Sequence, residues 1–369
     1  MRWFIAILCL LIISCTAASK GDKPTLTPCY APKYAKSFSV GTDSLNRKVL
    51  TITNPYQSDK SFEQHIYLLA DGQTAPEGKA YVRIPVERVS VLSSSHIAML
   101  DAIGAADKVV GVSGVKFISN EAVRSRAVEI GYDSALNYER IKAVGTDVIL
   151  LYGLYGEQSS VNTMLTQLDI PYIYIGDYTE ATPLGKAEWM VALAHLCGAE
   201  DKAVEYFTAL ESRYNTLKES ATHYTSRPKV MLNTPYRDTW FMPPVESYAV
   251  QLIADAGGEY IYPQNTSSQS QPISLEQALA LATTADVWIN VGQCNSLAQL
   301  GSENPKFTTV PAVVNGRVYN NTKRATDNGG SDFWESGAIN ADILLQDMIN
   351  ILHSENCTTD SLYYYKRLE

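Results

Sequence analysis

Two short apolar runs without polar alternation most constrain how this chain can fold. They are Val148–Leu151 and Tyr172–Ile175, and an amphipathic helical pattern, Val161–Leu168, lies between them. Apolar runs of this kind are typical of strands that are buried on both faces of a parallel sheet. A strand, a helix and a second strand in this order indicate a βαβ unit, which predicts an α/β fold class.

The same alternation of strand and helix patterns divides the chain into two lobes. Residues 86–182 and 227–355 are the alternating segments, and the mostly helical residues 183–226 separate them. We expect two Rossmann-like lobes joined by a long helical backbone. Residues 30–85 hold short β-rich runs between turn-forming clusters and predict a small β-rich N-terminal extension. Residues 356–369 are polar and predict a loosely held tail.

The N-terminus indicates the compartment. After Met1-Arg2, an apolar run of about a dozen residues has the length of a signal-peptide core and is too short to span a bilayer. It ends in Ile12-Ile13-Ser14-Cys15, which resembles the lipobox of bacterial lipoproteins. This resemblance implies cleavage of residues 1–14 and lipidation of Cys15. Residues 16–28 are small, polar and contain proline, so we expect a flexible tether over residues 15–29. An ordinary secretory signal with an incidental cysteine is the alternative.

Charge and metal-ligating residues exclude several classes of function. The formal net charge is −9, and nucleic-acid binding is not expected because it requires clusters of Lys and Arg that neutralise phosphates. The five histidines are scattered, whereas a site for a bare metal ion needs two or three that converge with a carboxylate. We therefore expect neither a metal site nor a cofactor, and any metal would arrive already chelated.

The cysteines leave the disulfide pattern open. Once Cys9 is removed and Cys15 is lipidated, Cys29, Cys197, Cys294 and Cys357 remain, and four cysteines allow three complete pairings. Cys197 ends an apolar helical pattern, so a buried free thiol is as good an interpretation of it as a bridge.

The two lobes repeat one motif. Glu139 and Glu276 each stand in the first turn of a helical pattern that leads to an aspartate and a buried strand. A carboxylate in this position complements the helix dipole, and Ser274 with Gln277 has the spacing of a capping box. Capping alone could therefore explain the motif.

The order of the elements resembles the helical-backbone class of periplasmic binding proteins, which serve importers of ferric siderophores, haem and cobalamin. The resemblance covers about residues 86–352, and its motifs are Arg88–Ser93, Gly111-Val112, the two glutamate-then-strand motifs, the connecting helices, Ala256–Gly258 and Asn315–Tyr319. The extension and the segment Gly329–Gly337 resemble lipoprotein members from Bacteroidetes-like bacteria. Relatives commonly carry a proline before the serine of the first loop, where this chain has Ser93-Ser94-Ser95.

The resemblance implies partners and sites. Glu139 and Glu276 match the carboxylates with which such proteins dock onto the permease of an ABC importer, whose ATPase supplies the work. The chain would be a monomer, anchored at Cys15 on the periplasmic face of the cell envelope. Its ligand, a small-molecule chelate of iron or cobalt, would bind between the lobes at the carboxyl ends of the strands. Strand ends and loops give the candidate ligand-binding residues Ser95, His96, Tyr132, Tyr152, Tyr155, Tyr236, Arg237, Trp240, Asp332 and Trp334.

Two alternative functions use the same sequence. A surface lipoprotein could hand a chelate to an outer-membrane transporter, but the residues after Cys15 lack the acidic run used for surface export. An enzyme would need a catalytic motif, and adjacent residues such as Ser95-His96 seldom point together. The segment Gly111–Gly114 also misses the G-x-S-x-G pattern by one position. We therefore expect a binding protein rather than an enzyme.

Overall fold

The structure is a computed structural model that describes residues 24–55, 62–132, 135–153, 160–354 and 357–369. The predicted signal peptide, Cys15 and Tyr155 lie outside the described residues.

The first lobe is built on a parallel sheet with the strand order β12-β11-β6-β7-β8. Its strands are β6 (Val89–Val91), β7 (Val109–Val112), β8 (Val128–Glu129), β11 (Val148–Leu151) and β12 (Tyr172–Tyr174). The connections contain α1 (Ser94–Ala102), η1 (Ala106–Lys108), η2 (Val115–Phe117), α2 (Glu121–Arg124), the ribbon of β9 (Gly131–Tyr132) and β10 (Ala135–Leu136), α3 (Tyr138–Ala143), α4 (Ser160–Gln167) and η3 (Asp177–Thr179). The βαβ unit predicted from the two apolar runs is confirmed, because β11 and β12 pair in parallel with α4 between them.

The second lobe is built on a mixed sheet with the strand order β15-β13-β17-β18-β19, in which only the last pair, β18 and β19, is antiparallel. Its strands are β13 (Lys229–Leu232), β15 (Glu259–Tyr260), β17 (Val287–Ile289), β18 (Val318–Asn320) and β19 (Lys366–Arg367). The other elements are the ribbon of β14 (Thr239–Met242) and β16 (Gln271–Ser274), the helices α7 (Tyr248–Asp255), α8 (Leu275–Ala282), α9 (Leu297–Glu303), α10 (Pro311–Val314) and α11 (Ala341–His353), and the short helices η4 (Pro305–Phe307), η5 (Ser336–Ala338) and η6 (Thr359–Ser361). The predicted α/β fold with two lobes is confirmed.

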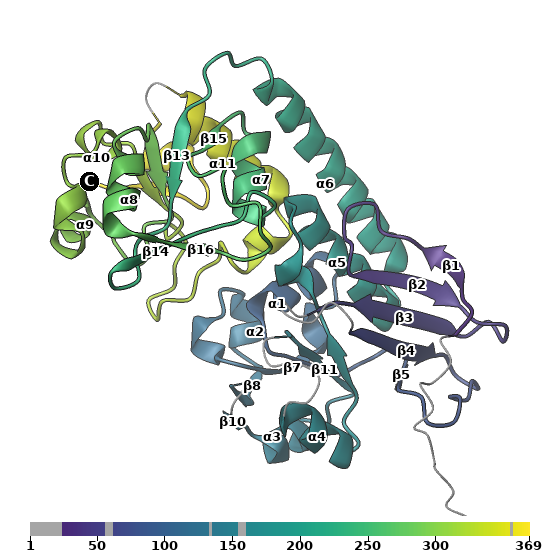
Figure 1. Cartoon of the computed structure of the whole chain (residues 1–369). Coiled ribbons are helices and arrows are strands. Elements are labelled where there is room, and N and C mark those ends of the chain that lie inside the picture. The colour runs from purple at the N-terminus through teal and green to yellow at the C-terminus, as the bar shows by residue number, and fades with distance from the viewer. Residues whose placement is uncertain (1–23, 56–61, 133–134, 154–159, 355–356) are drawn as a thin grey trace, which may run out of the picture.

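Two helices connect the lobes, α5 (Pro183–Cys197) and α6 (Glu200–Ala221). Helix α5 begins after the Thr182 cap, with Pro183 at its first position. It ends at Gly198, which adopts the left-handed conformation. Helix α5 is buried over almost its whole length, whereas α6 runs along the outside from the first lobe to the second (Figure 1). Among the described residues, no helix has both the length and the apolarity needed to cross a membrane.

The extension is a five-stranded sheet, as its β-rich composition predicts. It consists of β1 (Thr27–Tyr30), β2 (Phe38–Thr42), β3 (Lys48–Thr53), β4 (Glu63–Leu69) and β5 (Tyr81–Arg83), and only β4 and β5 pair in parallel. Strand β1 begins inside the predicted tether, which therefore ends before Thr27. The sheet packs beside α5 on the first lobe (Figure 1).

The prediction of a loose tail is wrong. Strand β19 pairs with β18, and Tyr364 and Tyr365 are buried. The carboxylate of Asp347 in α11 accepts hydrogen bonds from the backbone amides of residues 363–365. Local polarity did not reveal this, because the aromatic side chains of the tail are covered by distant parts of the second lobe.

The described cysteines are all free thiols. Cys29 is exposed, and Cys197, Cys294 and Cys357 are buried. Burial raises the pKa of Cys197 to about 12, which keeps it a neutral, unreactive thiol. The interpretation of Cys197 as a buried thiol is confirmed.

Candidate ligand-binding cleft

A cleft of about 1370 Å³ lies between the two lobes. The ends of β6, β7 and β11 supply its first wall, with Ser93–Ser95, Ser113 and Tyr152. These are carboxyl ends of parallel strands, where open α/β sheets bind ligands. Ser93 and Ser95 are joined by a hydrogen bond of 2.9 Å between their hydroxyls.

The second lobe supplies the opposite wall. This wall is lined by residues 243–244 and 246–249, around the start of α7, and by residues 268–270, Phe333, Trp334 and Ala338. Trp334 is 55% exposed, so its indole is accessible in the cleft. Aromatic rings and hydroxyl groups therefore face each other across the space between the lobes.

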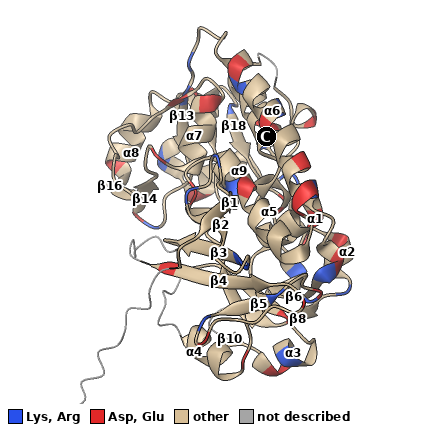
Figure 2. Cartoon of the chain, turned by 90° about the vertical axis from the view of Figure 1, so that its right-hand side faces the viewer, with Lys and Arg blue, Asp and Glu red and all other residues tan. Residues whose placement is uncertain are grey.

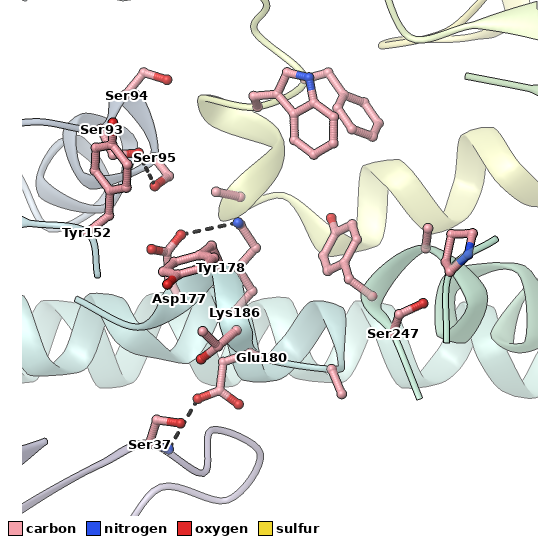
Figure 3. Close-up of a pocket in the computed structure, with 18 of the residues that line it drawn as sticks. Ser37, Ser93, Ser94, Ser95, Tyr152, Asp177, Tyr178, Glu180, Lys186 and Ser247 are labelled. Carbon is pink, nitrogen blue, oxygen red and sulfur yellow. Dashed lines mark hydrogen bonds and ion pairs between the residues drawn. The ribbon is translucent and has the colours of Figure 1, made fainter. Parts of the chain in front are cut away.

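The third wall comes from the extension and from the segment that enters α5. Asp177 is only 2% exposed and lies 3.2 Å from the ammonium of Lys186 (Figure 3). It also lies 3.4 Å from Nε2 of the buried His96. Burial alone would raise the pKa of Asp177, but the charge of Lys186 and the contact with His96 outweigh it and hold this pKa well below its usual range. Asp177 is therefore a permanent anion that holds Lys186 at the cleft.

Two buried carboxylates attach the extension to this wall. Glu180 accepts hydrogen bonds from the backbone amides of Lys36 and Ser37 and from the indole of Trp189. Glu188 accepts from the hydroxyl of Tyr30 and from the amides of residues 33–35, at 2.7–2.8 Å. Burying a carboxylate is costly unless such bonds satisfy it, so both glutamates fix the path of the extension.

A third buried carboxylate joins the two lobes directly. Glu335, 2% exposed, accepts hydrogen bonds from the amides of Ser119 (2.7 Å) and Asn120 (2.6 Å) in the first lobe. Beside this contact, a Cβ added to Gly330 would lie 1.9 Å from the carbonyl oxygen of Phe117, so only glycine fits there. The lobes therefore meet at one side of the cleft through the hydrogen bonds of Glu335 and the close approach of Gly330 to Phe117.

The contact through Glu335 should depend on pH. Burial raises the pKa of this carboxyl to about 7, with a further rise from Asp332, against the amide hydrogen bonds and Arg124, which favour the charged form. Since this pKa exceeds the ordinary value of 4.5, the contribution of Glu335 to stability is fully present below pH 4.5 and is lost as the pH rises towards 7. Glu335→Gln, a mimic of the protonated acid, should therefore gain about 3 kcal/mol of stability relative to wild type between these limits.

Urea denaturation of both proteins at pH 4.5 and pH 8 measures this difference. Glu121→Gln, an exposed glutamate on the neighbouring helix α2, is the control and should show no such gain. A Glu335→Gln profile parallel to that of wild type would contradict the prediction.

The structure brings together some of the predicted ligand-binding residues. Ser95, Tyr132, Tyr152 and Trp334 line the cleft, where ligand contact by each stays a prediction. His96 is fully buried behind the cleft, against Asp177.

The other candidates lie away from the cleft. Asp332 is buried in an ion pair of 2.5 Å with Arg324, and Tyr236 and Arg237 occupy an exposed turn before β14. Trp240 is fully buried between Trp288 and Phe307. The strand-end rule fails at Tyr236, Arg237 and Trp240 because the chain continues from β13 into the β14–β16 ribbon, which leads it away from the cleft.

Sequence reasoning also missed residues that do line the cleft. Tyr178 follows β12, and the strand-end rule applied to that strand would have found it. Lys36 and Ser37 lie in the extension and Lys186 in a connecting helix, and no local pattern indicated that either segment reaches the cleft.

The two predicted docking glutamates are exposed, one on each lobe. Glu139 lies in the first turn of α3 and Glu276 in that of α8 (Figure 1). Ser274 and Gln277 form the predicted capping box, so the cap of α8 does not need Glu276. Lys306 approaches Glu276 only to 3.8 Å at the surface. Throughout the described ranges, no three His, Cys, Asp or Glu side chains gather as a metal site would require.

Sequence and structure comparisons place this architecture in a family. The chain matches the model of the periplasmic binding protein family over residues 89–325 and belongs to that family. An uncharacterized lipoprotein of Methanocaldococcus jannaschii is 27% identical over 354 residues, which cover 88% of this chain and 82% of the relative. This relative is archaeal and lends no support to the Bacteroidetes type inferred from the sequence.

Solved structures share the fold. A periplasmic haem-binding protein from Pseudomonas aeruginosa superposes with a TM-score of 0.58 at 16% identity, over 77% of this chain and 98% of that one. A siderophore-binding protein from Vibrio cholerae, solved with Fe³⁺-Desferal, has a TM-score of 0.54 at 19% identity, over 72% and 99%. The family and these neighbours are binding proteins. Acidic and basic residues are interspersed over both lobes of this chain (Figure 2).

Proposed function

We propose that this chain is the lipid-anchored solute-binding protein of an ABC importer. It captures a chelated metal between its lobes and delivers it to the permease without catalysing a reaction. The chelate is a ferric siderophore, haem or a cobalamin. It would act as a monomer, held at the periplasmic face by the lipid on Cys15. The family membership and the relative named as a lipoprotein support this proposal.

The cleft is the observation that carries the proposal. Pockets for drug-sized ligands measure about 300–1,000 Å³, so a cleft of about 1370 Å³ suits a larger cargo. Amphipathic and apolar rings that can pack on a large ligand line the cleft, and they belong to Phe117, Tyr132, Tyr152, Tyr178, Tyr248, Phe333 and Trp334. The described residues offer no ligand cluster for a bare ion, which favours a cargo whose metal is already chelated.

Tryptophan fluorescence tests the proposal directly. Of the described tryptophans, Trp189, Trp240 and Trp288 are buried and only Trp334 is exposed in the cleft. Titration of the chain truncated after Cys15 with haem, cyanocobalamin and ferric siderophores should give saturable quenching by one class at micromolar affinity or tighter. Trp334→Phe should lose most of this signal while equilibrium dialysis shows that it still binds. Saturable binding of none of these chelates would contradict the proposal.

The docking glutamates should affect transport and leave capture intact. Glu139→Gln combined with Glu276→Gln should lower uptake of the chelate by cells about tenfold, because charged groups at an interface rim set its register and association rate. Affinity for the chelate should not change, since neither residue lines the cleft. Glu121→Gln, another exposed first-turn glutamate of the first lobe, is the matched control. Normal uptake with the double variant would exclude docking through this pair.

A further inference from the structure

The extension lies outside the family-matched residues 89–325, yet it forms part of the cleft. Lys36, Ser37 and Asn54 come from it and line the same cavity as Lys186 at the start of α5. Figure 3 shows Ser37 below Glu180, with Asp177 and Lys186 side by side above them. The extension therefore changes the binding site that the two lobes alone would make.

Buried bonds hold this wall in place. The amides of Lys36 and Ser37 donate to Glu180, and the segment just before them is held by Glu188. Both glutamates are at least 94% buried, with exposures of 6% and 1%. Because their oxygens are engaged by these amides and by Trp189 and Tyr30, neither carboxylate is available to a ligand.

Lys186 presents its ammonium between the lobes. Its nitrogen lies 3.2 Å from Asp177 on the first-lobe side and 5.9 Å from the ring centre of Tyr248 in the second lobe. Asp177 is turned inward and almost fully covered, whereas the side chain of Lys186 retains 14% exposure. An ammonium has three donors, so the ion pair with Asp177 leaves donors for a ligand in the cleft.

The charged groups that a ligand can reach are divided between the walls of the cleft, because the carboxylates of the extension wall are buried. Lys36 and Lys186 are the cationic residues that line it, and both belong to the wall made by the extension and α5. Among the lining carboxylates, Asp177 and Glu180 are buried, and Glu246, on the second-lobe wall, is exposed. A ligand on the extension wall would meet the ammonium of Lys186, the exposed residue Lys36 and the hydroxyl of Ser37.

We propose that Lys36 and Lys186 form an anion-binding subsite, supplied in part by the extension, that selects chelates carrying an outward-facing anionic oxygen group. The group is a carboxylate or a catecholate oxygen, and a neutral or cationic chelate would gain nothing from this wall. This proposal rests on the proposed function, because the subsite would bind a group of the same chelate in the same cleft. Removing one charge-assisted hydrogen bond typically weakens binding by about tenfold or more.

Four variants of the full mature chain test the subsite. Haem, with its carboxylates, and a ferric tris-catecholate are the anionic probes, and cyanocobalamin and ferric desferrioxamine B are the neutral and cationic ones. Lys186→Met and Lys36→Met should each weaken the anionic probe that binds by about tenfold, and Lys186→Arg should retain most of the affinity. Lys33→Met is the matched control, because Lys33 lies on the same segment but pairs with Glu211 away from the cleft.

The outcomes separate the subsite from the proposed function. Tighter binding of an anionic probe, weakened in Lys36→Met and Lys186→Met and kept in Lys33→Met, supports the subsite. Unchanged affinity in Lys36→Met and Lys186→Met, or a wild-type chain that binds only a neutral or cationic probe, overturns the subsite and leaves the transport proposal intact. A wild-type chain that binds none of the four probes overturns both. Thermal unfolding of each variant establishes that it is folded, and Lys36→Met, at an exposed position, remains a valid test if Lys186→Met is not.

Discussion

Glu188→Ala is expected to lower the free energy of unfolding by about 4 kcal/mol and to release the N-terminal segment from α5. The carboxylate is 1% exposed and accepts four hydrogen bonds, from the hydroxyl of Tyr30 and the amides of residues 33–35. A buried donor that loses its acceptor costs about 1–3 kcal/mol, and water can reach some of these donors once the segment loosens. The expected loss is therefore smaller than the sum of four separate penalties.

Urea denaturation and limited proteolysis measure the two parts of this effect. In Glu188→Ala, cleavage should begin between residues 24 and 37 at protease concentrations that leave wild type intact. Glu205→Ala removes an exposed carboxylate from the outer face of α6 and should change stability by no more than about 0.5 kcal/mol. Equal stability of Glu188→Ala and wild type would show that the extension is held by its apolar contacts alone.

The same variant bears on the cleft. Since the segment held by Glu188 continues directly into Lys36 and Ser37, its release should weaken anionic chelates without any change in the two lobes. Deletion of the whole extension would not isolate this effect on binding. Strand β2 packs on α5, so its loss would also expose apolar surface of α5. The single substitution Glu188→Ala is therefore the more specific test of what the extension contributes to binding.

The fold followed from local patterns, because the strands of both lobes are buried on two faces and show it in their composition. Val148–Leu151 and Tyr172–Tyr174 are recognisable as strands without any knowledge of their neighbours. The helix starts at Glu139 and Glu276 were equally local, since capping involves residues three positions apart.

The site was less predictable, because its walls combine segments that are distant in sequence. The strand-end rule found Ser95 and Tyr152, which follow strands of the first sheet directly. It could not find Lys36 or Lys186, whose place depends on how the extension packs on α5. Glu188 lies in a helix whose apolar side chains predict burial. Only the structure shows that its carboxylate accepts hydrogen bonds from backbone amides 153–155 residues away.

Trp240 illustrates the opposite error, and its replacement should be the second large effect. Trp240→Ala is expected to lower the free energy of unfolding by about 3–5 kcal/mol, the usual cost of truncating a buried aromatic residue. Its ring is fully buried, with centroids 5.6 Å from Trp288 and 5.2 Å from Phe307, and its indole donates to the carbonyl of Leu232 at 2.9 Å. Alanine would leave a cavity beside two aromatic rings and one carbonyl without its donor.

Two further variants separate a core role from a ligand-binding role. Tyr236→Ala, at a side chain 65% exposed in the turn before β14, should change stability by no more than about 0.5 kcal/mol. Trp240→Phe keeps most of the ring volume but not the indole donor, so it should cost less than alanine and bind the chelate with wild-type affinity, because Trp240 does not line the cleft. Wild-type stability of Trp240→Ala together with lost chelate binding would instead show that Trp240 belongs to the binding site, as its position after a strand predicts.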